Sequence, residues 1–250
     1  MIIKKLTTTG HIPSTPKQVE LPGLSEDVHI AEIDDPQRFR QQLTEFRTIR
    51  GQKHRPCFFA LGVAGVGKSY LIDKARDEIT GINVGYVNIG DEMYAALLSK
   101  YPRLERDEIR NLSVKEQDET RAHVMEDIAR MSMRQLTIID THATIETPDG
   151  YMPGMTPEMF RQLLPCGIIL IEDSEEAIQA RRVKDNESGK RYRNPDPENI
   201  RRHQRINREV VNLIAAASNT PVIHIIRTGD ITKDTKLVNA EMLRNLPIIQ

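Results

Sequence analysis

Beyond residue 55, hydrophobic residues occur in short continuous runs that are separated by segments with helical spacing. The five runs are Cys57–Leu61, Val84–Ile89, Leu136–Asp140, Gly167–Ile171 and Pro221–Ile226. Runs of this length without polar alternation are typical of strands that are buried on both faces of a parallel sheet. The pattern therefore predicts an α/β domain, a parallel sheet with helices on both faces.

Capping signals begin several of the segments between these runs. Ser113-Val-Lys-Glu116 is a capping box, and it predicts a helix that continues to about Met131. Thr156 precedes a proline at a first helical position, and Ser174 precedes two glutamates. Two further helices are predicted from the spacing alone, at Lys68–Thr80 with Gly81 as the C-cap and at Glu198–Ser218.

The first 54 residues have a different pattern, with several prolines and no run that suits a sheet core. One amphipathic helix is predicted there, from Asp35 through Phe39, Leu43 and Phe46 to Gly51. It is expected to pack on the main domain or to bind a partner. The predicted organisation is an N-terminal extension at 1–54, a main α/β domain at 55–228 and a C-terminal tail at 229–250.

Composition excludes several classes of protein. The formal net charge is −1, so nothing global indicates nucleic-acid binding. No apolar run approaches the roughly 20 residues of a membrane-spanning helix, and the start has no signal core, so a cytoplasmic protein is expected. Cys57 and Cys166 form no CxxC pair and are expected to be buried, reduced thiols.

The strongest motif is Gly62-Val63-Ala64-Gly65-Val66-Gly67-Lys68-Ser69, which matches G-x-x-x-x-G-K-[ST] in full. It follows an apolar run and opens a helical pattern, which is the context that a phosphate loop requires. The glycines let the backbone curl so that its N–H groups point at phosphate oxygens. Lys68 is expected to reach the β- and γ-phosphates of ATP, and Ser69 is expected to ligate Mg²⁺.

Asp140 ends the third apolar run, where a carboxylate usually helps to hold magnesium near a phosphate loop. We expect it to bind Mg²⁺ through water, the alternative being a cap for the following turn. His142, two residues later, is expected to make a structural hydrogen bond rather than to act as a base.

Positive charge is concentrated between residues 181 and 208, which hold ten Lys or Arg and four Asp or Glu, a net charge of +6. Residues 185–197 are rich in Asn, Ser, Gly and Pro and are interpreted as a mobile loop. A mobile arginine loop over a phosphate site suits phosphoryl transfer, because it neutralises charge and excludes water. Arg191 and Arg193 are expected to contact phosphate; the alternatives are a solvated basic surface and a nucleic-acid patch.

Several segments together resemble the archaeal-type adenylate kinases. They are GVAGVGKSY at 62–70, INVGYVNIGDEM at 82–93, ERDEIRNLSVKEQ at 105–117, IIDTHATIETPDGYMPGM at 138–155 and RHQRINR at 202–208. The phosphate loop is common to many families, whereas DTHATIETPDGYMPG is much more specific. The resemblance covers about residues 56–227.

The resemblance implies the reaction ATP + AMP ⇌ 2 ADP with Mg²⁺, a P-loop fold with sheet order 2-3-1-4-5, and a short lid at about 184–199. It implies catalytic roles for Lys68, Arg181, Arg191 and Arg193. ATP phosphates would be held by Gly62 to Tyr70, and AMP by Gly90, Arg106, Arg110, Thr141, Thr144, Tyr151 and Gly154. Enzymes of this branch are often trimers, which makes a homo-oligomer plausible.

The chain departs from the family at Tyr70, where a second small hydroxyl is usual, and at Tyr94, where the common bacterial branch has an AMP-contacting arginine. Its lid segment is also slightly longer. Two alternative functions stay open at this point. One is a kinase for another monophosphate or a small alcohol, and the other is a non-catalytic ATP-dependent switch or assembly factor.

Overall fold

The computed structural model describes residues 55–79, 83–147, 150–189 and 192–246. The helix expected between residues 35 and 51, the predicted C-cap at Gly81 and the lid residue Arg191 lie outside these ranges. All five predicted strands lie within them, so the central sheet can be compared directly with the hydrophobic pattern.

The core is a parallel sheet of five strands in the order β2-β3-β1-β6-β7. The strands are β1 (Arg55–Leu61), β2 (Val84–Asn88), β3 (Leu136–Asp140), β6 (Pro165–Glu172) and β7 (Val222–Ile226). Counting these five strands alone along the chain gives 2-3-1-4-5, the order that the resemblance implied. The prediction of a parallel α/β sheet from five apolar runs is confirmed.

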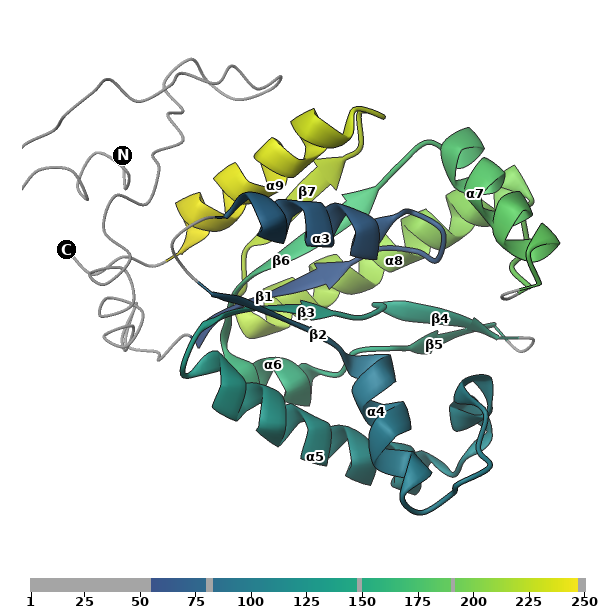
Figure 1. The fold of residues 1–250 in the computed structure, drawn as a ribbon, viewed down its shortest axis with the longest axis vertical. Coiled ribbons are helices and arrows are strands. Elements are labelled where there is room, and N and C mark those ends of the chain that lie inside the picture. The colour runs from purple at the N-terminus through teal and green to yellow at the C-terminus, as the bar shows by residue number, and fades with distance from the viewer. Residues whose placement is uncertain (1–54, 80–82, 148–149, 190–191, 247–250) are drawn as a thin grey trace, which may run out of the picture.

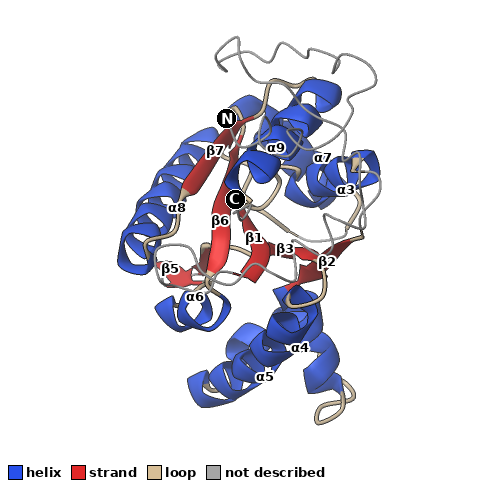
Figure 2. Ribbon diagram, turned by 90° about the vertical axis from the view of Figure 1, so that its left-hand side faces the viewer, coloured by secondary structure: helices blue, strands red, loops and turns tan. Residues whose placement is uncertain are grey.

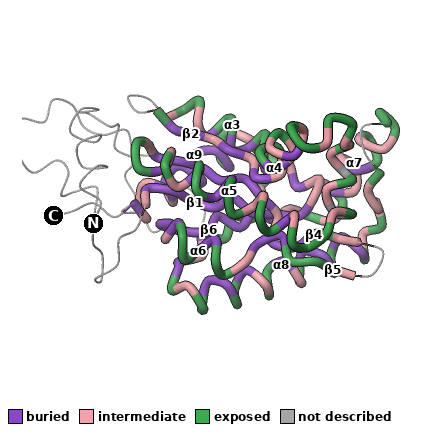
Figure 3. The backbone as a smooth tube through the Cα atoms, turned by 90° about the horizontal axis from the view of Figure 1, so that it is seen from below, coloured by how far each residue is buried: buried purple, intermediate pink, exposed green. Residues whose placement is uncertain are grey.

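Helices cover both faces of this sheet (Figure 1). On one face lie α3 (Lys68–Glu78) and α9 (Ile231–Asn245), and on the other lie α5 (Val114–Ser132), α6 (Pro157–Leu163) and α8 (Pro197–Ser218). Alternate residues of β1 point to opposite faces, so Phe58 joins one hydrophobic cluster and Phe59 the other. β1, β3 and β6 are accordingly buried along almost their whole length, as Figure 3 shows for β1 and β6, whereas the edge strand β7 exposes His224 and Ile226.

The predicted helix starts are confirmed. Ser113 and Ser174 accept hydrogen bonds from backbone N–H groups at the starts of α5 and α7 (Glu175–Glu187), and Thr156 is the N-cap of α6. Phe160 of α6 stacks on Phe59 with ring centroids 4.6 Å apart. Cys57 and Cys166 are buried and free, and burial raises the pKa of Cys57 to about 12.

Three elements surround the carboxyl ends of the strands. They are α4 (Ile89–Leu98), the short 3₁₀ helix η1 (Arg106–Asn111), and an antiparallel hairpin of β4 (Thr144–Thr147) and β5 (Gly150–Pro153). In Figure 1 the hairpin and α4 lie at the same end of the sheet as α7. Figure 2 shows α4 and α5 together beyond β2, with α8 beside β7 at the opposite edge.

The structure corrects two boundaries. Helix α7 continues to Glu187, so residues 184–187 of the predicted lid are helical rather than loop. The predicted C-terminal tail carries α9, whose Val238 and Met242 lie in the same buried cluster as Phe58. That helix is part of the folded domain. Within the described ranges, every helix is too short or too polar to cross a lipid bilayer.

Candidate active site

The phosphate loop connects β1 to α3. Val63 and Val66 are buried and anchor the loop to the core, while Gly65 and Gly67 have φ angles of 88° and 83°, which favour glycine. Gly67 is the N-cap of α3 and makes no side-chain capping bond. The first N–H groups of this helix are therefore not capped by its N-cap side chain, and they suit an anion.

Four side chains meet behind this loop. Lys68 forms an ion pair with Asp140 at the end of β3, and it also donates to the Thr141 carbonyl at 2.7 Å. Ser69 and Tyr86 both donate to Asp140 Oδ2, at 2.9 and 2.5 Å. The structure therefore brings together Lys68, Ser69 and Asp140, which the sequence assigned to one site.

Burial shifts the pKa values of two groups at this site, Lys68 and His142. It lowers the pKa of Lys68 to about 7, while the contacting Asp140 carboxylate acts in the opposite direction by favouring the ammonium. Burial also lowers the pKa of His142 to about 3, and the nearby Lys68 charge adds to this effect. His142 is therefore neutral at physiological pH, and its Nδ1 donates to the Gly62 carbonyl at 3.1 Å. This is the structural hydrogen bond that was expected.

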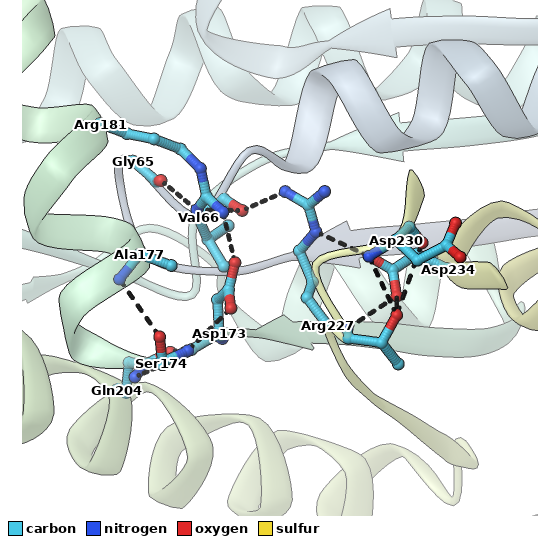
Figure 4. Close-up of polar contacts among 11 residues, drawn as sticks. Gly65, Val66, Asp173, Ser174, Ala177, Arg181, Gln204, Arg227, Asp230 and Asp234 are labelled. Atoms are coloured by element: carbon cyan, nitrogen blue, oxygen red, sulfur yellow. Dashed lines mark hydrogen bonds and ion pairs between the residues drawn. The ribbon is translucent and has the colours of Figure 1, made fainter. Parts of the chain in front are cut away.

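Three arginines bind the outer side of the phosphate loop, and Figure 4 shows two of them, Arg181 and Arg227. Arg181 Nη1 donates to the carbonyls of Gly65 and Val66 at 3.0 and 3.1 Å, and its Nη2 pairs with Asp173 at 2.5 Å. Arg182 Nε donates to the Ala64 carbonyl at 3.0 Å, and Arg227 Nη1 to the Val66 carbonyl at 3.1 Å. Of these, the sequence had assigned only Arg181 to the site.

The C-terminal part of the predicted lid contacts α7 through Arg193 and Asn194. Arg193 pairs with Asp185 at 3.0 Å, and its backbone exchanges two hydrogen bonds of 2.8 Å with the Asn186 side chain. Buried Arg182 also donates to the Asn194 carbonyl at 2.6 Å. The described contacts of Arg193 thus connect it to α7, and its expected contact with phosphate stays a prediction.

The candidate acceptor side is built around α4. Arg106 pairs with Asp91 at 2.6 Å and donates to the Asn88 side chain, which caps this helix, at 3.2 Å. A side chain at Gly90 would approach the Arg106 guanidinium closely. Arg110 lies in η1, but its side chain is outside the described part of the structure. Of the two predicted acceptor arginines, Arg106 is therefore placed beside Gly90.

The β4–β5 hairpin packs on α8 through polar groups. Thr144 contacts His203 Nε2 at 3.1 Å and donates to Asn207 at 3.2 Å, and the Tyr151 ring lies 4.8 Å from the His203 ring. Gly154 passes so close to the His142 carbonyl that a side chain there would collide with it. Thr144 and Tyr151 therefore face α8, and their roles toward AMP stay predictions. His203 and Asn207 had not been predicted.

Of the two departures from the family pattern, Tyr70 is exposed and Tyr94 is half-buried. Tyr70 is 56% exposed at the start of α3, so its phenol has moved outward rather than filling the place of a small hydroxyl. Tyr94 donates to the Leu104 carbonyl at 3.2 Å and so braces the segment between α4 and η1.

Comparisons with known proteins identify the family. A family model described as an AAA domain matches residues 61–201. An adenylate kinase from Methanopyrus kandleri is 35% identical over 75% of this chain and 97% of its own length, and one from Pyrococcus horikoshii is 36% identical over 68% and 84%. Among solved structures, a shikimate kinase from Acinetobacter baumannii has 13% identity and a TM-score of 0.48 over 81% of this chain and 98% of its own. The chain belongs to the archaeal-type adenylate kinase family.

Proposed function

We propose that this protein transfers the γ-phosphoryl group of ATP to AMP, reversibly, to give two ADP. The observation that carries the proposal is the meeting of Lys68, Ser69 and Asp140 behind a complete phosphate loop. Sequence identity of 35% and 36% with two proteins named adenylate kinase supports the choice of AMP as the acceptor.

The donor site follows from the loop. Backbone N–H groups of residues 62–69 and the start of α3 would hold the ATP phosphates. The Lys68 ammonium lies among Asp140, Thr141 and the loop, where it would contact the β- and γ-phosphates. With the lid closed, Arg191 and Arg193 of the lid and Arg181 of α7 would neutralise charge on the phosphoryl group and exclude water.

The donor set also fits magnesium. Ser69 Oγ and the Asp140 carboxylate are oxygen donors 2.9 Å apart, and Mg²⁺ prefers a few such protein ligands together with phosphate oxygens and water. When bound, the ion neutralises phosphate charge. Asp140 would act through water, because both of its oxygens already have partners. Oδ1 pairs with Lys68, and Oδ2 accepts from Ser69 and Tyr86.

The reaction requires no protein base. The attacking group is a phosphate oxygen of AMP, which is already ionised; it forms a bond to the γ-phosphorus while the bond to the β-phosphate oxygen breaks. The acceptor phosphate needs positioning in line with this bond. We assign that task to Arg110 and Arg106 beside Gly90, and we assign the base and ribose to Thr141, Thr144, Tyr151 and Gly154.

The proposal is tested by ADP formation from MgATP with AMP, CMP, UMP, GMP or no acceptor. Strong turnover with AMP alone is the expected result. ADP formation at the same rate with every acceptor, or at that rate without any acceptor, would contradict it and would favour another acceptor or an ATPase switch. Light scattering of the same preparation would test the homo-oligomer, for which a trimer is the expected form.

A further inference from the structure

The outer side of the phosphate loop has its own binding partners. A loop that turns its N–H groups toward phosphate directs several carbonyls away from it, and these need donors of their own. Here the Val66 carbonyl accepts from two guanidinium groups, Arg181 at 3.1 Å and Arg227 at 3.1 Å. Figure 4 shows both side chains converging on this one residue from different elements.

Arg227 is fixed from behind by a buried carboxylate. It follows β7 directly, its side chain is 7% exposed, and its Nε donates to Asp234 at 3.2 Å. Asp234 is in the first turn of α9 and also accepts from the Thr228 backbone and hydroxyl, both at 2.8 Å. Because the carboxylate has three donors and is fully buried, it holds the guanidinium in one orientation.

Gly67 makes room for this guanidinium. A side chain at Gly67 would collide with Arg227 Nη1 and would also lie near the Arg181 guanidinium. The glycine is therefore needed for two reasons, its φ of 83° and the arginine packed against its outer face.

We propose that Arg227 is a positioning residue of the donor site, which holds the phosphate loop in its ATP-binding form through the Val66 carbonyl. The inference rests on the proposed function in taking ATP as the donor. The carbonyl that it binds belongs to the same peptide unit as the Gly67 N–H, which opens α3. A cation at the oxygen end of this peptide polarises the N–H toward an incoming phosphate.

Arg181 and Arg227 have different tasks in this arrangement. The Arg181 side chain is 34% exposed and reaches the loop from α7, next to the lid, so it can exchange its contacts with Asp173 and the loop for the transferred phosphoryl group. The Arg227 side chain is almost inaccessible to solvent and pairs with Asp234 of α9, so it stays on the Val66 carbonyl when Arg181 leaves. Helix α9 thus becomes part of the donor site through the pairing of Asp234 with Arg227.

The test compares Arg227→Gln with the wild-type protein. MgATP affinity, measured by calorimetric titration without AMP, should fall about tenfold, and the KM for ATP should rise with it. The KM for AMP should change less than twofold, which distinguishes this role from a general loss of structure. Arg244→Gln is the matched control, since it removes an arginine of α9 that also pairs with a carboxylate, Glu241, at 2.8 Å, but lies outside the phosphate loop.

Two further variants address the buried carboxylate that Arg227→Gln leaves behind. The double variant Arg227→Gln/Asp234→Asn removes both charges and should bind ATP as weakly as the single variant. Arg227→Lys, with one ammonium in place of a fork, should restore affinity only in part. Recovery of wild-type affinity in the double variant would overturn the proposal, because the unpaired Asp234 would then explain the loss.

The outcomes separate this inference from the proposed function. Phosphorylation of AMP by the wild-type protein together with unchanged ATP affinity in Arg227→Gln would overturn the inference alone. Weakened MgATP binding in a protein that does not phosphorylate AMP would leave the inference standing and would overturn the proposed function.

Discussion

Lys68 is expected to stabilise the fold as well as the reaction. It pairs with Asp140, a carboxylate that is fully buried, and Lys68 itself is also buried. Lys68→Met keeps the apolar stem and removes only the ammonium, so its effect isolates the charge. The variant should lose phosphoryl transfer almost completely, and it should also be less stable, because a buried carboxylate is left without its cation.

The magnitude follows from the remaining partners of Asp140. Removing one member of a buried ion pair costs about 3–5 kcal/mol of unfolding free energy. Ser69 and Tyr86 still donate to the carboxylate in the variant, which favours the lower value, about 3 kcal/mol. At about 2–4 °C per kcal/mol for a domain of this size, Tm should fall by about 6–12 °C.

Asp140→Asn should cost less, about 1–2 kcal/mol, because a lysine can neutralise itself by releasing its proton. Burial lowers the Lys68 pKa to about 7, below its value in the unfolded chain. Between pH 7 and pH 10 the unfolded state therefore binds more protons, and the unfolding free energy rises with pH. This rise should be steeper in Asp140→Asn than in the wild-type protein, since no carboxylate there favours the ammonium.

Urea denaturation of the wild type, both single variants and Lys68→Met/Asp140→Asn completes a double-mutant cycle. The double variant has no unpaired charge, so it should recover about 2 kcal/mol relative to the sum of the single changes, within the range for contacting residues. Additivity within about 0.5 kcal/mol would refute the reasoning. So would an unfolding free energy of Asp140→Asn that is flat between pH 7 and pH 9.

Three further predictions concern packing, the acceptor site and the histidine. Phe160→Ala removes a buried ring stacked on Phe59 and should lower stability by about 3–5 kcal/mol, whereas exposed Leu213→Ala should change it by less than about 0.5 kcal/mol; equal Tm shifts would contradict this. Arg110→Ala should raise the KM for AMP more than the KM for ATP, and the reverse order in steady-state kinetics would exclude it as the acceptor ligand. His142→Asn should leave the pH–rate profile unchanged between pH 5 and pH 8, because the pKa of His142 is lowered to about 3; disappearance of an acid limb would show that it titrates in catalysis.

The sheet could be predicted because strands buried on both faces must be apolar at every position. The hairpin was missed for the opposite reason. Residues 144–147 and 150–153 form strands of four residues each, too short for an alternation of polar and apolar residues to be recognised. Helix α9 did carry a signal, since Asp230 caps a segment in which Ile231, Val238 and Met242 are spaced as on one helical face.

The inner side of the phosphate loop could be predicted from its motif, and the outer side could not. Glycine, lysine and serine at fixed spacing are required by the phosphate, so they mark the sequence directly. Arg181, Arg182 and Arg227 donate to backbone carbonyls. Because every residue has one, these acceptors cannot be recognised in the sequence. Arg227 is 161 residues from Val66, and only the fold brings the two together.

The net charge of residues 181–208 likewise does not reveal which of its arginines are paired in the fold. A net charge of +6 between residues 181 and 208 suggested cations free to meet phosphate. In the structure Arg181, Arg193, Arg201 and Arg208 pair with Asp173, Asp185, Glu175 and Glu172, three of which lie outside that segment. Much of the charge is therefore compensated locally, and what matters for the reaction is which pairs can open. Arg181 pairs at the loop itself and is partly exposed, so it can exchange its carboxylate for phosphate, whereas Arg227 cannot leave a carboxylate that is buried with it.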